Sequence, residues 1–214
     1  MLASLALATI VLQDVNRMGL SSADILRMGR SQWVETYVNH FGKTSSDLVT
    51  AQSTYGEVLF EFNESQLKNK SAATRAALRG LRRYAIDFQM NLIDLKACFS
   101  GGGTMWAPIR AGVVADVEEL LQPLVLGRCR PQNRWTAVAL EKNFDYINAQ
   151  IGRNSKAMDR AKDAEISSKA ARSLLKSARK SFDRIAEIAG KRSQDESDWI
   201  LEFCNGQLQF DDVL

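Results

Sequence analysis

The residues best suited to chemistry in this 214-residue chain are three consecutive glycines that lead into Thr104. Glycines before a helix expose several backbone N–H groups at the positive end of the helix dipole, where a phosphate or carboxylate can bind. Arg110 follows within two helical turns and adds a positive charge. The segment therefore predicts a seat for an anion or small ligand, formed by Gly101, Gly102, Gly103, Thr104 and Arg110.

A structural interpretation of the same glycines is favoured. No strand precedes them, and neither a Gly-Lys-Ser/Thr ending nor a G-x-G-x-x-G spacing is present, so no nucleotide fingerprint applies. Glycine enters left-handed backbone conformations at low cost, and three in succession cannot sustain a helix. We expect a sharp turn between two helices first and a binding site second.

A second candidate surface is a basic stripe on one predicted helix, on the side away from its apolar residues. Glu165, Asp183 and Glu187 interrupt the stripe, and it lacks aromatic or amide residues that stack on or read bases. A nucleic-acid partner is therefore disfavoured. We interpret the stripe as a solvated face that is available to a protein partner, and it consists of Lys169, Arg172, Lys176, Arg179 and Lys180.

The other reactive residues form no recognisable catalytic or metal-binding pattern. His40 is the only histidine, and Cys98, Cys129 and Cys204 lie far apart without a Cys-x-x-Cys or Cys-x-x-His pair. Widely spaced cysteines in odd number fit a reducing compartment, so we expect a cytoplasmic protein. No catalytic residue, metal or cofactor is predicted. No spacing singles out an acid–base pair among the carboxylates Glu61, Asp87, Asp94, Glu118 and Glu119.

A long helix over residues 72–99 leads into the glycines and organises the predicted fold. Its apolar residues recur at spacings of three and four, which is typical of one buried helix face. These residues are Leu78, Leu81, Ala85, Phe88, Leu92, Leu95 and Phe99. A second long helix, residues 155–189, carries a similar stripe rich in alanine and including Leu175 and Phe182.

The rest of the chain predicts shorter helices. With three prolines and no alternating β-branched run, the fold class is all-α, a bundle of about seven helices. Gly42, Pro123 and Gly152 are expected to end helices, and Asn133 to begin one. The expected segments are 2–18, 22–40, 45–63, 104–121, 133–151 and 198–204.

Size and charge favour one helical domain over residues 1–214 with an acidic C-terminal segment, residues 193–214. This segment has six acidic residues and no basic one, whereas residues 153–192 carry twelve Lys and Arg against five Asp and Glu. The tail can fold back on the basic helix or stay in solvent. The apolar start, MLASLALATIVL, is too short to span a bilayer, so we expect a buried helix that Gly19 ends.

These observations favour a non-catalytic interaction or scaffold protein. Its long helices would present a surface to a protein partner or to a second copy of the chain. The alternative is an anion- or small-ligand-binding protein, with or without catalysis, that uses residues 100–104 and Arg110. A weaker alternative is membrane action through release of the apolar N-terminal helix.

Overall fold

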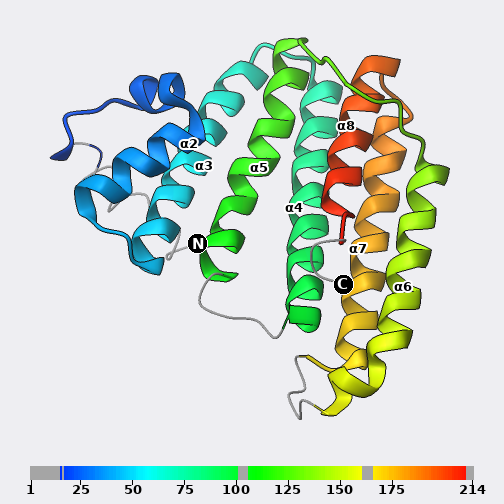
Figure 1. Ribbon diagram of the computed structural model, residues 1–214. Coiled ribbons are helices and arrows are strands. Elements are labelled where there is room, and N and C mark those ends of the chain that lie inside the picture. The colour runs from blue at the N-terminus through cyan, green and yellow to red at the C-terminus, as the bar shows by residue number, and fades with distance from the viewer. Residues whose placement is uncertain (1–14, 16, 101–105, 161–165, 211–214) are drawn as a thin grey trace.

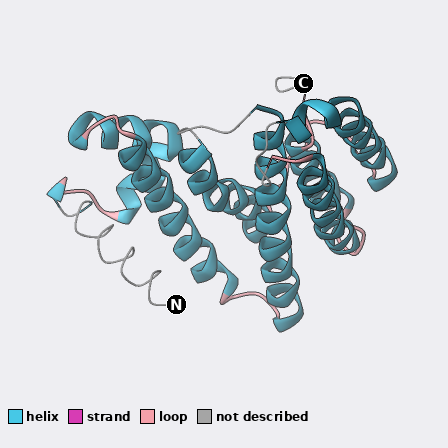
Figure 2. Ribbon diagram, turned by 90° about the horizontal axis from the view of Figure 1, so that it is seen from below, coloured by secondary structure: helices cyan, strands magenta, loops and turns pink. Residues whose placement is uncertain are grey.

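The computed structural model describes residues 15, 17–100, 106–160 and 166–210, and these residues form helices joined by short loops (Figures 1 and 2). The predicted all-α bundle of about seven helices is confirmed, because the described residues contain seven helices and no strand. Nearly all of the predicted helix 2–18 lies outside the described residues. The helices are α2 (Ser22–Phe41), α3 (Ser45–Leu67), α4 (Ala72–Ser100), α5 (Trp106–Leu126), α6 (Ala137–Arg160), α7 (Ser168–Ala189) and α8 (Gln194–Gln207).

The predicted helix over residues 72–99 is confirmed as α4. It runs beside α7, which in turn packs on α6 (Figure 1). All but one of the predicted apolar residues of α4 are buried, and Phe99 is partly buried. At the centre, the ring of Phe88 lies 6.4 Å from that of Phe144 on α6 and 6.2 Å from that of Phe182 on α7.

The predicted helix over residues 155–189 is wrong. Residues 155–160 form the last turns of α6, and α7 begins only at Ser168. Gly152 does not end α6, because a single glycine inside a helix costs only about 1 kcal/mol. The Ser167 side chain caps α7 by accepting from the backbone N–H of Ala170, and Asp159 of α6 accepts from the Ser168 N–H at 2.8 Å.

The helix end predicted at Pro123 and the helix start predicted at Asn133 also differ from the structure. Pro123 lies in the last turn of α5, which continues to Leu126. Gly127 then leaves the helix with φ +66°, a backbone conformation that glycine tolerates, and the Arg128 N–H donates to the Pro123 carbonyl at 2.8 Å. Thr136, and not Asn133, is placed to cap α6, because its hydroxyl accepts from the Ala139 N–H.

The described part of the acidic segment is folded into the bundle. α8 begins after the Ser193 cap and buries Ile200, Leu201 and Cys204 in the main core. Its acidic residues do not pair with the basic stripe. Instead, the Glu196 carboxylate accepts two hydrogen bonds, each of 2.9 Å, from the guanidinium of Arg192, which lies in the turn before α8.

The apolar side chains form two clusters, and α5 contributes to both. The main cluster lies among α4, α5, α6, α7 and α8, and a smaller cluster lies between α2 and α3. Val113 and Val117 of α5 face the main cluster, while Ala115 faces the smaller one. Within the described residues, no helix combines the length and apolar character that crossing a membrane requires.

Gly56 marks the closest approach of α3 to α5. A Cβ atom at this position would lie 3.0 Å from the Ala115 nitrogen and 3.2 Å from a Val114 methyl carbon. Because backbone cannot move aside easily, Gly56→Ala should destabilise the protein by about 1–3 kcal/mol in urea unfolding. Gly152→Ala is the control, since open space surrounds that helical glycine. It should stabilise by about 0.5–1 kcal/mol, and equal behaviour of the two variants would contradict the close approach.

Candidate functional site

Three carboxylates in the middle of α5 point to different neighbours. They are Asp116, Glu118 and Glu119, which follow one another within a single helical turn. Successive residues of a helix face different directions, so each carboxylate meets a different part of the bundle. Asp116 and Glu118 are bound to side chains of other helices, and Asp116 and Glu119 border a pocket.

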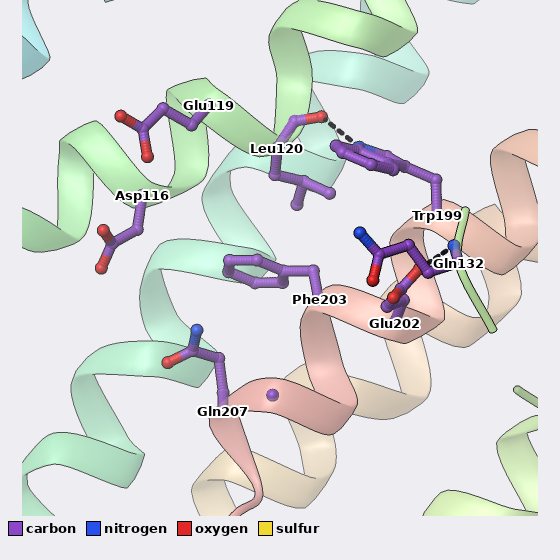
Figure 3. A pocket seen from close by; sticks show the side chains of 9 residues that line it. Asp116, Glu119, Leu120, Gln132, Trp199, Glu202, Phe203 and Gln207 are labelled. Atoms are coloured by element: carbon purple, nitrogen blue, oxygen red, sulfur yellow. Dashed lines mark hydrogen bonds between the residues drawn. The ribbon is translucent and has the colours of Figure 1, made fainter. Parts of the chain in front are cut away.

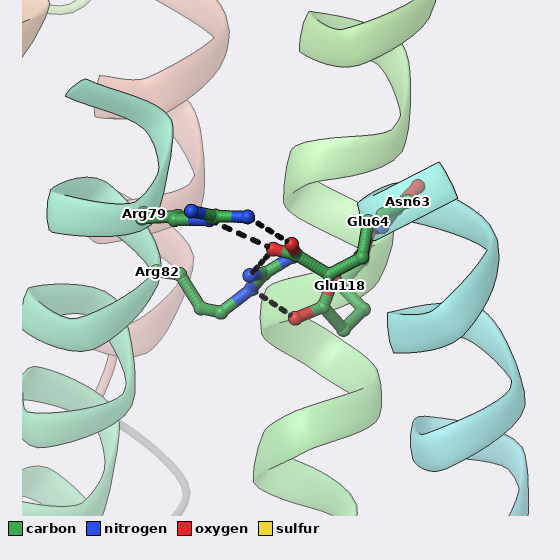
Figure 4. Close-up of polar contacts among 5 residues, drawn as sticks. All are labelled: Asn63, Glu64, Arg79, Arg82 and Glu118. Carbon is green, nitrogen blue, oxygen red and sulfur yellow. Dashed lines mark hydrogen bonds and ion pairs between the residues drawn. The ribbon is translucent and has the colours of Figure 1, made fainter. Parts of the chain in front are cut away.

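Glu118 lies in a buried ionic network between α3, α4 and α5 (Figure 4). Its side chain is 0% exposed and forms an ion pair with Arg82 at 2.5 Å. Asn63 donates to the Glu118 carboxylate at 2.8 Å, and Arg82 also pairs with Glu64, which Arg79 contacts in turn. Burial raises the pKa of Glu118, although Arg82 and Asn63 favour its charged form. We interpret this network as structural.

Asp116 connects α5 to α2 and α4. Its carboxylate pairs with Arg30 and accepts a hydrogen bond from the amide of Gln89. Arg30 also donates to the Gln52 side chain at 2.7 Å. Four helices therefore meet around one guanidinium and one carboxylate.

A cavity of about 480 Å³ opens between α5, α8 and the connection before α6 (Figure 3). We call it the acidic pocket. This volume is within the range of small-molecule sites, about 300–1,000 Å³. Its lining includes three carboxylates and two aromatic rings but no Lys or Arg. The lining residues are Asp116, Glu119, Leu120, Gln132, Trp199, Glu202, Phe203, Gly206 and Gln207.

The negative charge of the acidic pocket is only partly neutralised. Arg30 lies 3.7 Å from the Glu119 carboxylate but is bound more closely to Asp116. Glu202 accepts the backbone N–H of Gln132 at 2.9 Å and has no ion-pair partner among the described residues. Burial raises the pKa of Glu119, and Asp116 raises it further, while Arg30 opposes both effects. A bound cation would relieve this excess of negative charge.

Trp199 and Phe203 supply the apolar wall of the acidic pocket. They lie four residues apart on α8, so both project from one face of that helix. The Trp199 indole N–H donates to the Leu120 carbonyl at 2.9 Å, which fixes the ring against α5. Both side chains are only partly buried. The negative faces of such rings attract cations, so the rings and the carboxylates favour the same kind of ligand.

Four residues of the predicted anion seat lie outside the described residues: Gly101, Gly102, Gly103 and Thr104. Arg110 is described, is exposed and pairs with Asp94 across α4 and α5. It is therefore already engaged with a carboxylate.

All five residues of the basic stripe are exposed, as predicted for a solvated face. They do not converge on one site. Arg172, Lys176 and Arg179 line a small cavity of about 230 Å³ between α6 and α7, where Arg179 pairs with Glu141. Lys180 lines a different groove, between α7 and α4.

Reactive residues are not gathered elsewhere in the described structure. No three His, Cys, Asp or Glu side chains of the described residues are placed to hold a metal ion, the carboxylates of the acidic pocket included. The cysteines form no disulfide among these residues. Burial raises the pKa of the Cys129 thiol to about 11 and also raises that of Cys204, so neither is poised as a nucleophile.

The sequence does not predict the acidic pocket. Its two sides, on α5 and α8, are about eighty residues apart in the chain and share no motif. The only sign of the pocket in the sequence is local: Trp199, Glu202 and Phe203, which line it, lie within one and a half turns of a single helix. No family model, curated protein or solved structure matches this chain.

Proposed function

We propose that this chain is a non-catalytic interaction protein that binds a basic segment of a partner protein, with an arginine side chain in the acidic pocket. One observation carries the proposal: the incompletely neutralised carboxylates Glu119 and Glu202 border the partly exposed rings of Trp199 and Phe203. Arginine suits such a site because its planar guanidinium stacks on aromatic rings and pairs with carboxylates at the same time.

The proposal favours a different protein over self-association through α7. Leu175 and Phe182, the large apolar residues of the α7 stripe, are buried against neighbouring helices of the same chain. The α7 stripe is thus already covered, whereas the acidic pocket is open to a partner.

The test uses an acetylated and amidated hexa-arginine peptide and isothermal titration calorimetry. The peptide should bind, and Glu202→Gln should weaken binding by roughly three- to tenfold, because it removes a charge but keeps an oxygen for the Gln132 N–H. A hexa-lysine peptide should bind less tightly than hexa-arginine. Binding should also weaken as the pH falls from 7, since burial raises the pKa of Glu119 and its carboxylate loses its charge at a higher pH than an ordinary glutamate does.

The matched control is Glu35→Gln. Glu35 is exposed on α2 and does not line the acidic pocket, so its substitution changes the net charge equally. It should leave the affinity nearly unchanged. Equal weakening by both variants would show attraction to overall charge alone, and absence of peptide binding would refute the proposal.

A further inference from the structure

A second cavity, of about 520 Å³, lies between α4 and α7 and has the opposite charge. We call it the basic groove. Three cations border it, Arg83 from α4 and Lys180 and Arg184 from α7, against the single carboxylate of Asp87. Uncharged hydrogen-bonding groups complete the lining: Tyr84, Asn91, Ser177 and Ser181.

The cations of the basic groove are not neutralised by its own carboxylate. Arg83 and Asp87 lie four residues apart on α4 but form no ion pair with each other. Arg83 instead donates to the Tyr84 hydroxyl at 2.7 Å and stacks on that ring, its guanidinium carbon 4.6 Å from the ring centroid. Lys180 has no ion-pair partner among the described residues. Arg184 pairs with Glu187, which Lys191 also contacts.

Arg83 and Lys180, the two cations of the groove without a carboxylate partner among the described residues, match one ligand group well. A phosphate monoester carries about −1.5 to −2 charges at pH 7, whereas a carboxylate carries only one. Arginine and lysine are the side chains that bind phosphate oxygens most effectively. The anionic group that best neutralises the groove is therefore a phosphate monoester.

The remaining lining indicates what the phosphate is attached to. The exposed Asp87 carboxylate can only accept hydrogen bonds, so it would repel a bare anion but bind a hydroxyl group. Ser177 and the amide of Asn91 add further polar partners in the same groove. We infer that the basic groove binds a phosphorylated polyol or sugar, with the phosphate on Arg83 and Lys180 and a hydroxyl on Asp87.

This inference is independent of the acidic pocket, with which the groove shares no residue. Calorimetry with glucose 6-phosphate, inorganic phosphate and glucose tests it on the full chain. Glucose 6-phosphate should bind more tightly than inorganic phosphate, and glucose should not bind measurably. A co-sedimentation arm with phosphatidylcholine vesicles, with and without a phosphorylated phosphatidylinositol, shows whether the same chemistry comes from a lipid headgroup.

The double variant Arg83→Gln/Lys180→Gln should reduce affinity at least tenfold in whichever arm binds. Its control, Lys142→Gln/Arg153→Gln, removes two exposed cations of α6 that do not line the groove, and should have little effect. Asp87→Ala should lower the preference for glucose 6-phosphate over inorganic phosphate, a change that a purely structural role would not produce. Glu202→Gln should bind as the unaltered protein does.

Absence of binding in both arms, or equal losses in the two double variants, would overturn the inference. So would an unchanged preference in Asp87→Ala. Because the substitutions in the basic groove and in its control are at exposed positions, loss of the fold is not expected to obscure the result.

Discussion

Arg82→Met should destabilise the protein by about 3–5 kcal/mol at pH 7, the largest effect that we expect from a single polar side chain. Arg82 is the cation that pairs with Glu118, whose side chain is 0% exposed. Removing one member of a buried ion pair leaves the other charge without compensation in a poorly solvated place. Urea unfolding followed by circular dichroism measures the change in the free energy of unfolding.

The loss should become smaller in acid. Burial already raises the pKa of Glu118, and without Arg82 the pKa rises further. An acid whose pKa is higher in the folded than in the unfolded state is harder to ionise in the folded protein. The free energy of unfolding therefore falls as the pH rises above the unfolded-state pKa and through the folded-state pKa. The difference between Arg82→Met and the unaltered protein should therefore narrow as the pH falls from 7 to about 5.

Two further variants separate the buried pair from the exposed part of the network. Arg82→Met/Glu118→Leu replaces both charges with apolar groups and should recover most of the lost stability. Asn63 then keeps its hydrogen bond to the Glu118 backbone carbonyl at 2.9 Å. Arg79→Met, which alters an exposed partner of Glu64, should have little effect. A double variant no more stable than Arg82→Met would contradict this account.

The predictions that depended on periodicity succeeded where large apolar residues repeat. In α4 the spacing of Leu81, Phe88 and Leu95 has one structural solution, a helix with that face buried. A long amphipathic helix is stabilised by the packing of its apolar face, so periodicity identifies both the element and its buried side.

Periodicity failed at the junction of α6 and α7. Alanines continue the three–four spacing across that junction, and alanine is the best helix former, so neither pattern nor propensity marks a break. The break is marked instead by the Ser167 cap and by the contact of Asp159 with Ser168. Serines are common in this region, and only the tertiary structure shows which of them caps a helix.

The candidate site could be predicted only in fragments. The run from Asp116 to Glu119 is visible in the sequence, but its spacing does not show which carboxylate is buried. That depends on Arg82 and Arg30, which approach from other helices. A pocket formed by two distant helices has no sequence signature of its own, because neither side is complete without the other.

Phe182→Ala is expected to destabilise the protein by about 3–5 kcal/mol while leaving a single unfolding transition. Phe182 is 1% exposed, and its ring lies 5.3 Å from that of Phe144 and 6.2 Å from that of Phe88. Truncation would leave a cavity at the point where α4, α6 and α7 meet, and large cavities in cores cost energy in this range. Urea unfolding followed by circular dichroism and by tryptophan fluorescence gives both the loss and the number of transitions.

One transition is expected because the two apolar clusters are joined by more than chain connectivity. α5 contributes to both, and the contacts of Asp116 with Arg30 and Gln89 connect α2 to α4 through it. Trp33→Ala, in the smaller cluster, should therefore lower the same transition that Phe182→Ala lowers. Tyr146→Ala, which removes a 45% exposed ring from α6, should change stability by less than about 0.5 kcal/mol. If Phe182→Ala instead produced two separate transitions, the clusters would be independent folding units, and the prediction of one domain would be wrong.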